Sequence, residues 1–372
     1  MANADLTIVL TIKDRARFTY RWMKYMSDMH CPYKILIADG GKDVSLQEYL
    51  SHKGNYLDLD YEYLRYPYDA TVNDYYIKLM DVVSRVKSEY VLLADDDDFY
   101  LLDRIPELMA FLDSHEDYVG ARGGLVNFTL YGRDAKPSRL RADERYLAFA
   151  IKAASIDDSD PFERVEKACT QMSKCDYYAN WYSVFRTSAF QDTWRQFVGL
   201  EIKEIIVSEI LTHVLMLMSG KIKIMDFPYY ARQMYTSMFG DTLVVGNEFL
   251  ERCVINNSLS EFGIVIDRYF ASKTREERNR ILCAIAAWLE EFVSNIYLNR
   301  KFLKTGILYY LRTGKFFNFR EKMKSIFLFN QKISRIYYSI RCRIFPVPNS
   351  EIVQLKVLEP YILKPGVYRK EL

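Results

Sequence analysis

Short apolar runs alternate with helix-like segments over the first hundred residues, and this alternation restricts the fold more than any other feature. Four runs have the length and composition of strands, at 6–12, 33–39, 59–66 and 89–95. Between them, apolar residues recur along one side of a helix, at 17–29, 46–52 and 71–86. Strands and helices that alternate in this way form a parallel sheet covered by helices. The chain is therefore predicted to have an α/β fold.

Beyond residue 100 the pattern becomes less regular. The later elements are predicted to be a helix at 101–115 and a strand broken by glycines at 117–128. A strand followed by a helix is predicted at 177–190, a helix at 201–220 and a strand at 221–233. Residues 131–176 are polar and charged, which is typical of a helical insertion or a mobile lid. We divide the chain into an α/β domain, 1–240, with halves 1–130 and 131–240, and a mostly helical, basic C-terminal extension, 241–372.

The stretch "LLADDDDFY", residues 92–100, places four aspartates in a row directly after an apolar run. Adjacent carboxylates repel one another, so the clustering needs either water or a cation to make it stable. Asp95 and Asp97 form a D-x-D pair, and hard cations such as Mg²⁺ and Mn²⁺ prefer oxygen ligands of this kind. The alternative is a solvated acidic loop that caps the next helix. The position of the aspartates at the end of a buried strand favours the metal site, because ligands of parallel sheets bind at strand ends.

Two other strand ends carry polar residues. Thr11, Lys13 and Arg15 follow the first strand, where basic side chains suit the phosphates or base of a nucleotide. Asp39 ends the second strand, and the two glycines after it allow a tight turn with close backbone approach. Its carboxylate suits the N–H of a nucleotide base. An ordinary capping loop and a simple Asp-Gly turn are the alternatives.

Taken together, "LTIKDR" (10–15), "ADGGKD" (38–43) and "SEYVLLADDDDF" (88–99) resemble a known family. They are similar to the nucleotide-sugar-binding half of GT-A-type glycosyltransferases, in particular the family-2-like group of bacterial cell-surface polysaccharide and glycolipid glycosyltransferases. The first stretch departs from the family pattern because Thr11 stands where proline is usual. The resemblance covers about residues 5 to 235, and it depends on the order and spacing of all three stretches.

The resemblance implies a GT-A-like fold: a mixed, mostly parallel sheet flanked by helices, here with a helical C-terminal extension. It implies an inverting, metal-dependent transfer of sugar from a nucleoside-diphosphate sugar, with Mn²⁺ or Mg²⁺ as cofactor and Asp95 and Asp97 as metal ligands. The acceptor would be a glycan or a lipid-linked molecule in surface polysaccharide synthesis. The residues expected to contact the nucleotide or its diphosphate are Thr11, Lys13, Arg15, Asp39, Asp95, Asp96 and Arg232.

The resemblance also implies a catalytic base, since inverting members use a carboxylate near the start of a helix beyond the metal site. Glu209 best matches that position, although Ser208 stands where the family often has an acid. An exposed helix residue is the alternative interpretation of Glu209. The other candidate bases are Asp176, Asp192, Glu201 and Glu204. On the acceptor side the resemblance points to Asp98, Asn180 and Trp181, although Trp181 also fits a core position.

Residues 300–343 contain twelve lysines and arginines and one acid, Glu321, whereas the whole chain has a net charge of +2. The remainder of the chain is therefore acidic, at 2 − 11 = −9. Basic and aromatic residues alternate in this segment at helical spacing, which suits an anionic membrane surface. The alternatives are a packed helical domain with a solvated basic face and an oligomer interface. Nucleic-acid binding is not expected, because no nucleic-acid-binding signature accompanies the charge.

The six cysteines show neither a CxxC spacing nor a paired framework, which indicates reduced thiols in the cytoplasm. The N-terminus lacks the pattern of a secretory signal, and no stretch reaches the ~18 apolar residues of a membrane span. We therefore expect a cytoplasmic protein. If its basic segment binds anionic lipids, the protein would be attached peripherally to the inner face of the plasma membrane.

Two other functions remain open at this point. One is a Mg²⁺-dependent nucleotidyltransferase, which also holds its metal with carboxylates, although the chain lacks the glycine- and lysine-rich first loop common in such enzymes. The other is a non-catalytic adaptor that binds membranes or polyanions and carries a degenerate GT-A fold. P-loop, dinucleotide-binding and zinc-hydrolase motifs are absent from the sequence, so it supports none of those chemistries.

Overall fold

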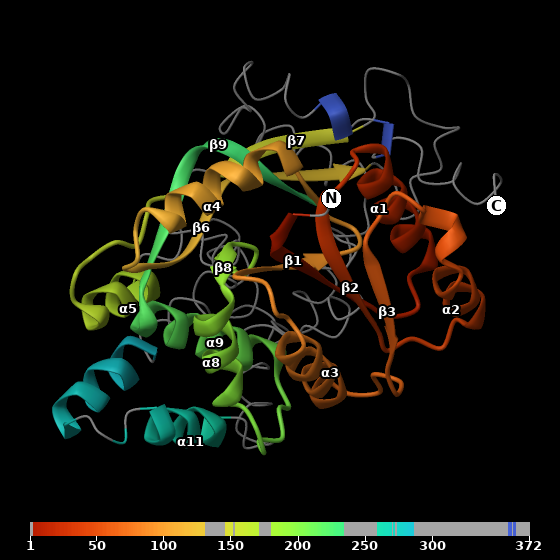
Figure 1. Ribbon diagram of the computed structural model, residues 1–372. Helices are drawn as coiled ribbons and strands as arrows, with labels where there is room; N and C mark the ends of the chain where they lie inside the picture. Colours follow the sequence, from red (N-terminus) through yellow and green to blue (C-terminus); the bar gives the residue numbers. More distant parts are fainter. Residues whose placement is uncertain are drawn as a thin grey trace, which may run out of the picture.

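One mixed sheet runs through the protein in the computed structural model, which describes residues 3–130, 146–151, 153–170, 180–233, 259–269, 271, 274–285, 356–358 and 360–361 (Figure 1). Within these residues the sheet has nine strands: eight follow the order β3-β2-β1-β4-β8-β6-β9-β5, and the ninth, β7, pairs with β6. The strands are β1 (Asn3–Ile12), β2 (Tyr33–Asp39), β3 (Tyr61–Arg65), β4 (Tyr90–Asp95), β5 (Phe99–Tyr100), β6 (Tyr118–Leu130), β7 (Tyr146–Ile151), β8 (Val184–Arg186) and β9 (Lys221–Gln233).

The N-terminal half of the sheet is wholly parallel. Strand β1 pairs with β2 on one side and β4 on the other, and β3 lies outside β2. The four strands predicted from the apolar runs are those four strands, so the predicted α/β class is confirmed. Because parallel strands end at one edge, this half brings the ends of β1, β2 and β4 together.

The second half of the sheet is mixed. Strand β8 runs antiparallel to β4 and β6, whereas β6 and β9 are parallel to each other. The register of β6 against β9 shifts next to its glycines. A Cβ on Gly123 would lie 2.5 Å from the carbonyl oxygen of Phe227, so glycine allows the two long strands to approach closely. The segment 131–176, expected to be a helical insertion or a mobile lid, contains a strand of this sheet, β7, and a helix, α5 (Pro161–Thr170).

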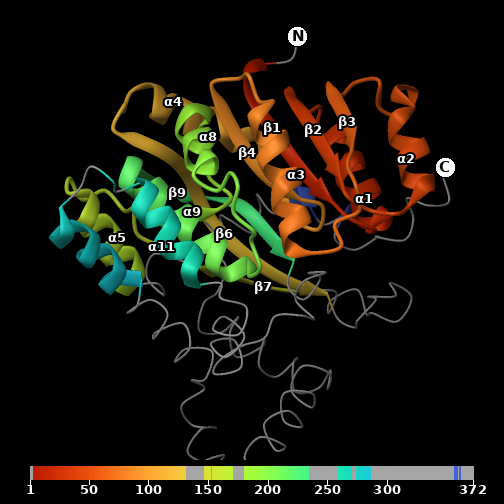
Figure 2. The same cartoon turned by 90° about the horizontal axis from the view of Figure 1, so that it is seen from below.

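Helices cover both faces of the sheet (Figure 2). Alternate residues of β1 point to opposite faces, with Val9 in one core cluster and Ile8 and Leu10 in the other. The first cluster includes residues of α3, α8 and α9, and the second includes residues of α1, α2 and α4. Their bounds are α1 (Ala16–Asp28), α2 (Val44–Ser51), α3 (Val72–Ser84), α4 (Ile105–Asp113), α8 (Thr187–Arg195) and α9 (Ile205–Ser219).

Two parts of the predicted C-terminal extension pack on this body. Helix α11 (Leu259–Tyr269) and residues 275–285 contribute to the core beside α9. Near the other end, Tyr361 donates a hydrogen bond to Asp28 over 2.7 Å. The basic segment 300–343 lies outside the described residues. Among the helices that the structure describes, none combines the length and the hydropathy needed to cross a membrane.

Candidate active site

Three strand ends meet at the carboxyl edge of the parallel half-sheet. Thr11, near the end of β1, lies opposite Asp95 at the end of β4, and Ile12 lies opposite Asp39 at the end of β2. Three of the predicted residues, Thr11, Asp39 and Asp95, are therefore neighbours in space although up to 84 positions separate them, from 11 to 95. Ligands of open α/β sheets bind at this kind of edge.

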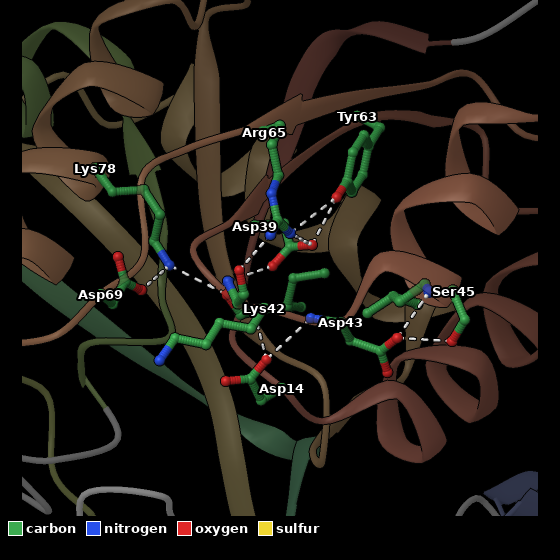
Figure 3. Close-up of polar contacts among 12 residues, drawn as sticks. Asp14, Asp39, Lys42, Asp43, Ser45, Tyr63, Arg65, Asp69 and Lys78 are labelled. Carbon is green, nitrogen blue, oxygen red and sulfur yellow. Dashed lines mark hydrogen bonds and ion pairs between the residues drawn. The ribbon is translucent and has the colours of Figure 1, made fainter.

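The carboxylate of Asp39 is buried and is bonded to three nearby residues. It accepts hydrogen bonds from the backbone N–H of Gly41 (2.7 Å), the hydroxyl of Tyr63 (2.6 Å) and the guanidinium of Arg65 (2.7 Å). Figure 3 shows Tyr63 and Arg65 converging on this carboxylate. Burial and the bond to Asp39 raise the pKa of Tyr63, so its hydroxyl stays protonated and remains a donor. This end of the site is held in one arrangement by its own contacts.

The loop after β1 is tied to the loop after β2. Asp14 has a φ of 50°, in the left-handed region, and its Oδ1 accepts hydrogen bonds from the backbone N–H groups of Lys42 and Asp43. A Cβ on Gly41 would lie 2.7 Å from the backbone nitrogen of Asp14, so only glycine fits this close approach. The Lys13 ammonium donates to the carbonyl oxygen of Asp69 over 2.5 Å. The backbone of residues 13 and 14 is thus fixed against its neighbours.

A buried ion pair joins Lys78 of α3 to Asp69, next to Gly40 (Figure 3). The two side chains are only 2% and 1% exposed, and Lys78 also donates to the carbonyl oxygen of Ile12 over 3.2 Å. Burial lowers the pKa of Lys78 and raises that of Asp69, while their mutual attraction opposes both shifts. A side chain at residue 40 would collide with the Asp69 carboxylate.

The acidic turn, residues 95–98, has partners on several elements. Asp95 accepts a hydrogen bond from the hydroxyl of Tyr182 over 2.5 Å. Asp98 accepts one from the hydroxyl of Tyr230 and another from the backbone N–H of Gln233, over 2.7 Å. The rings of the two tyrosines stack with their centroids 4.5 Å apart. Burial and the neighbouring Asp97 raise the pKa of both Asp95 and Asp98.

The middle two aspartates face α1. Asp96 accepts a hydrogen bond from Thr19 (2.9 Å) and lies 3.4 Å from Nε of Arg15. Asp97 forms a 2.7 Å ion pair with Nη2 of Arg15, and its backbone carbonyl accepts a hydrogen bond from Arg21. Burial raises the pKa of Asp96 to about 7, although the charge of Arg15 opposes the shift. Asp96, predicted to contact the nucleotide, is 2% exposed and is held by Thr19 of α1 and by Arg15, the residue before that helix.

Three arginines offset the charge of the four carboxylates. Burial would lower the pKa of Arg15 and of Arg232, but nearby acidic groups raise both values. Burial dominates for Arg21, whose pKa falls to about 10. The formal balance of the turn with these arginines is 3 − 4 = −1. The clustering is therefore stabilised largely by the protein itself, and a divalent cation would add to that charge.

The donor set of the turn fits a hard divalent cation. Ligand oxygens of Asp95, Asp97 and Asp98 all lie within 4.8 Å of one another. The set is all carboxylate oxygen, which suits Mg²⁺ and Mn²⁺ and does not suit a soft metal. The predicted pair Asp95 and Asp97 lies together as expected. The third member, Asp98, was predicted on the acceptor side, whereas its two oxygens bind β9.

Glu209 lies in α9 and interacts electrostatically with this site. The side chain is partly buried, and desolvation raises the pKa of its carboxyl to about 7. Arg232 opposes that shift, and Asp95 adds to it. A carboxyl with this pKa is half ionised near neutral pH, which suits a general base. Ser208, the neighbour in place of an acid, is buried and bonds to backbone carbonyls of α9.

The remaining candidates occupy different environments. Asn180 is fully buried and accepts a hydrogen bond from Nε of Arg122 over 2.8 Å, while its Nδ2 has no hydrogen-bond partner among the residues that the structure describes. Trp181 packs edge-on against Trp194 with the ring centroids 5.8 Å apart. Asp192 and Glu201 form exposed ion pairs with Arg195 and Lys203, and Glu204 is buried before α9. Asp176 lies outside the described residues.

Several side chains at the site were not anticipated from the sequence. They are Tyr63, Arg65, Asp69, Lys78, Arg21 and Tyr230. A signal existed for the first two, because residues 63 and 65 alternate on the strand next to β2 and the Cα of Arg65 pairs with that of Asp39. Arg21 and Tyr230 carried no such signal, since their roles depend on contacts with a turn far away in the sequence.

Comparison with known proteins gives structural similarity only. No family model and no curated protein matches the chain. The crystal structure of S. aureus TarS 1–349 in complex with UDP-GlcNAc is 13% identical, with a TM-score of 0.43, and the match covers 86% of this chain and 91% of that chain. TarS 1–349 in complex with UDP is 14% identical, with a TM-score of 0.42 and coverages of 86% and 90%. These values are too low to transfer a ligand or an activity to this chain.

Proposed function

We propose that the protein is an inverting, metal-dependent glycosyltransferase of the GT-A type. The observation that carries the proposal is the group of three carboxylates at one sheet edge, whose ligand oxygens lie within 4.8 Å of one another. Glu209 of α9, whose carboxyl interacts electrostatically with Asp95 and has a pKa of about 7, adds a candidate base. Asp39 at the adjoining strand end supports a nucleotide site beside them. The family-2-like assignment rests on the three sequence stretches. The 1–240 domain would carry the reaction, and 241–372 would be an extension.

The proposed reaction is a single displacement. Glu209 removes the proton of an acceptor hydroxyl, whose oxygen attacks the anomeric carbon of a nucleoside-diphosphate sugar. The bond from that carbon to the diphosphate breaks, the configuration inverts, and the nucleoside diphosphate leaves with the bonding electrons. Thr11, Lys13, Arg15, Asp39 and Asp95 are proposed to hold the nucleotide. Arg232 is proposed to bind the diphosphate, since an arginine stays charged and presents several donors.

The metal would be held by Asp95 and Asp97, with Asp98 as a neighbouring carboxylate. Mn²⁺ or Mg²⁺, when bound there, would neutralise charge that develops on the diphosphate. Asn180 and Trp181 remain proposed acceptor-side residues. Asp96 contacts Thr19 and Arg15, so we propose that it stabilises the acidic turn and does not contact the nucleotide directly.

The donor is tested by measuring the melting temperature with a panel of nucleotide sugars, with and without Mn²⁺. A ligand that binds only the folded protein raises its stability, by about 2.7 kcal/mol at a hundredfold excess over Kd. We expect one nucleotide sugar to raise the melting temperature in a Mn²⁺-dependent way. Stabilisation by no member of the panel, under either condition, would contradict the proposal.

Glu209 is tested by the pH dependence of kcat/KM. Because a base must be ionised, we expect activity to fall as the pH drops below about 7, the pKa of the Glu209 carboxyl. Glu209→Gln should lower kcat by about 10² to 10⁴ and abolish this acid limb. Glu107→Gln is the matched control, because Glu107 is exposed and paired with Arg104. An unchanged acid limb in Glu209→Gln would assign the base to another carboxylate.

Two further proposals concern the partners. The acceptor is proposed to be a glycan or a lipid-linked molecule of a surface polysaccharide, and the basic segment 300–343 is proposed to bind an anionic inner membrane face. Replacing six of its twelve lysines and arginines with glutamine should reduce flotation with anionic liposomes. Equal flotation of the two proteins would exclude this role for the segment, and an oligomer interface would then be examined by light scattering.

The product distinguishes the transferase from its alternatives. A nucleotidyltransferase releases pyrophosphate, whereas the proposed enzyme releases a nucleoside diphosphate. An adaptor would release neither and would be insensitive to Asp97→Ala. Release of a nucleoside diphosphate that needs both Mn²⁺ and Asp97 supports the glycosyltransferase alone.

A further inference from the structure

Arg15 occupies an unusual position at the start of α1. It is the N-cap residue, yet its side chain makes no capping hydrogen bond and extends to the acidic turn. Nη2 lies 2.7 Å from Asp97 and Nε lies 3.4 Å from Asp96. Its Cζ also lies 4.5 Å from the centre of the Phe18 ring. The guanidinium therefore serves as a resident counter-ion of two carboxylates.

One of those carboxylates belongs to the proposed metal site. Asp97 is a member of the group whose ligand oxygens lie within 4.8 Å of one another. A guanidinium on Asp97 and a divalent cation between Asp95, Asp97 and Asp98 would be like charges in a weakly solvated environment. Their repulsion is much stronger there than in water. A free metal ion must therefore either bind despite its repulsion by the Arg15 guanidinium or displace the guanidinium from Asp97.

Hydrogen bonds of neighbouring residues fix the backbone of this loop, whereas the Arg15 guanidinium is held through the two carboxylates and the Phe18 ring. Asp14 and Lys13 are tied to the neighbouring loops by hydrogen bonds. The Arg15 side chain is 14% exposed, whereas Arg21 is fully buried and donates to Gln233 and to a backbone carbonyl. Arg21 is thus a permanent part of the turn. Arg15 retains access to the strand edge where a diphosphate would lie.

We infer that Arg15 makes the acidic turn select a metal–nucleotide complex over the free metal ion. Without a ligand, the guanidinium pairs with Asp97 and weakens metal binding. When a nucleoside diphosphate arrives with the metal, its phosphate oxygens accept hydrogen bonds from the Arg15 guanidinium in place of Asp97. Arginine can make this exchange because it binds phosphate as well as carboxylate. This inference rests on the proposed function and adds a binding order to it. The coupling is reciprocal, so the metal must also strengthen nucleotide binding by the same factor.

The test measures Mn²⁺ affinity by titration calorimetry, alone and with saturating UDP, GDP or dTDP. We expect the wild-type protein to bind Mn²⁺ about tenfold more tightly or better with its preferred nucleotide, within the usual range of coupling between two sites. Arg15→Gln should bind free Mn²⁺ more tightly than wild type and lose most of the coupling. Arg17→Gln, an exposed arginine two residues along the same helix, is the matched control and should behave as wild type.

The outcomes separate this inference from the function on which it rests. If Mn²⁺ and a nucleotide bind but Arg15→Gln binds free Mn²⁺ no more tightly, or keeps the full coupling, the inference is overturned and the proposed function stands. If the wild-type protein binds none of the three nucleotides in the presence of Mn²⁺, both the inference and the proposed function are overturned. Should Arg15→Gln fail to fold, Arg15→Lys replaces it. An ammonium keeps the charge but lacks the planar, bidentate fork of a guanidinium, so we expect intermediate coupling, and coupling equal to wild type would overturn the inference.

Discussion

The ends of β2 and β4 both place a carboxylate at the site, but the two carboxylates are held in different ways. Asp39, at the end of β2, takes its side-chain partners from the next strand, Tyr63 and Arg65, which lie 24 and 26 residues away. The buried pair beside it, Asp69 with Lys78, spans only 9 residues. Together with the bonds from Lys13 to Asp69 and from Lys78 to Ile12, which span 56 and 66 residues, this nucleotide side is built within the first 78 residues of the chain.

The acidic turn at the end of β4 is assembled from distant parts of the domain. Its partners Thr19, Tyr182, Tyr230 and Gln233 are separated from it by 77, 87, 132 and 135 residues. The turn therefore reaches its final arrangement only when α1, β4 and β9 are all in place. The difference implies that the nucleotide side tolerates changes elsewhere, whereas the metal side responds to substitutions throughout the fold.

The largest effect on stability is expected on the nucleotide side, at the buried ion pair. Lys78→Met leaves the carboxylate of Asp69 buried without its counter-charge, which should lower the free energy of unfolding by about 3–5 kcal/mol. Urea denaturation measures the change. The surface control is Lys24→Met, since Lys24 pairs with Asp28 while 40% exposed, and such pairs contribute about 0–1 kcal/mol.

A double variant sharpens the interpretation. Replacing both partners, with Asp69→Leu and Lys78→Met, removes the unpaired charge, so much of the lost stability should return. If the double variant is no more stable than Lys78→Met, the loss comes from packing and the pair has no special role. If Lys24→Met costs as much as Lys78→Met, the nucleotide side is not the rigid element that its contacts indicate.

The next largest effect is on catalysis, and it contrasts the two strand ends directly. Asp97→Asn should lower kcat about a hundredfold or more, because it removes a carboxylate ligand of the proposed metal ion. That ion would neutralise the charge that develops on the departing diphosphate. Asp39→Asn should raise the KM for the donor about tenfold, the equivalent of about 1.4 kcal/mol, with little change in kcat. Steady-state kinetics at several Mn²⁺ concentrations separates the two patterns. A fall in kcat alone for both variants would remove the distinction between a binding side and a metal side.

The same contrast explains what could be predicted from the sequence. Apolar runs that end in Asp39 and Asp95 identify two strand ends, and parallel strands must bring such ends together. The α/β class and the grouping of Thr11, Asp39 and Asp95 followed from that rule alone. Tyr63 and Arg65 were within reach, because they alternate at the end of the adjoining strand.

The partners of the acidic turn were beyond such reasoning. Placing Tyr230 and Gln233 beside Asp98 requires the register of β9 against β5 and β6, and that register shifts at the glycines of β6. Local pattern does not determine a shift of this kind, because it depends on how closely two backbones approach. The pKa of Glu209 was equally unpredictable, since it depends on the burial of its carboxyl by the assembled fold.

The smallest effects are expected for the two tyrosines that hold the ends of the acidic turn. Tyr230→Phe removes a donor to Asp98, whose other oxygen keeps the backbone N–H of Gln233, so the free energy of unfolding should fall by about 1–3 kcal/mol. Tyr182→Phe removes the donor to Asp95, which is less buried, so we expect a smaller loss of stability and a loss of about 10–100-fold in Mn²⁺ affinity. Urea denaturation and Mn²⁺ titration of both variants measure the two effects. If Tyr182→Phe leaves Mn²⁺ affinity unchanged, Asp95 is not oriented through its hydroxyl partner. Because both tyrosines lie far from residue 95 in the sequence, a change in metal affinity from either one would demonstrate that distant elements assemble the metal side.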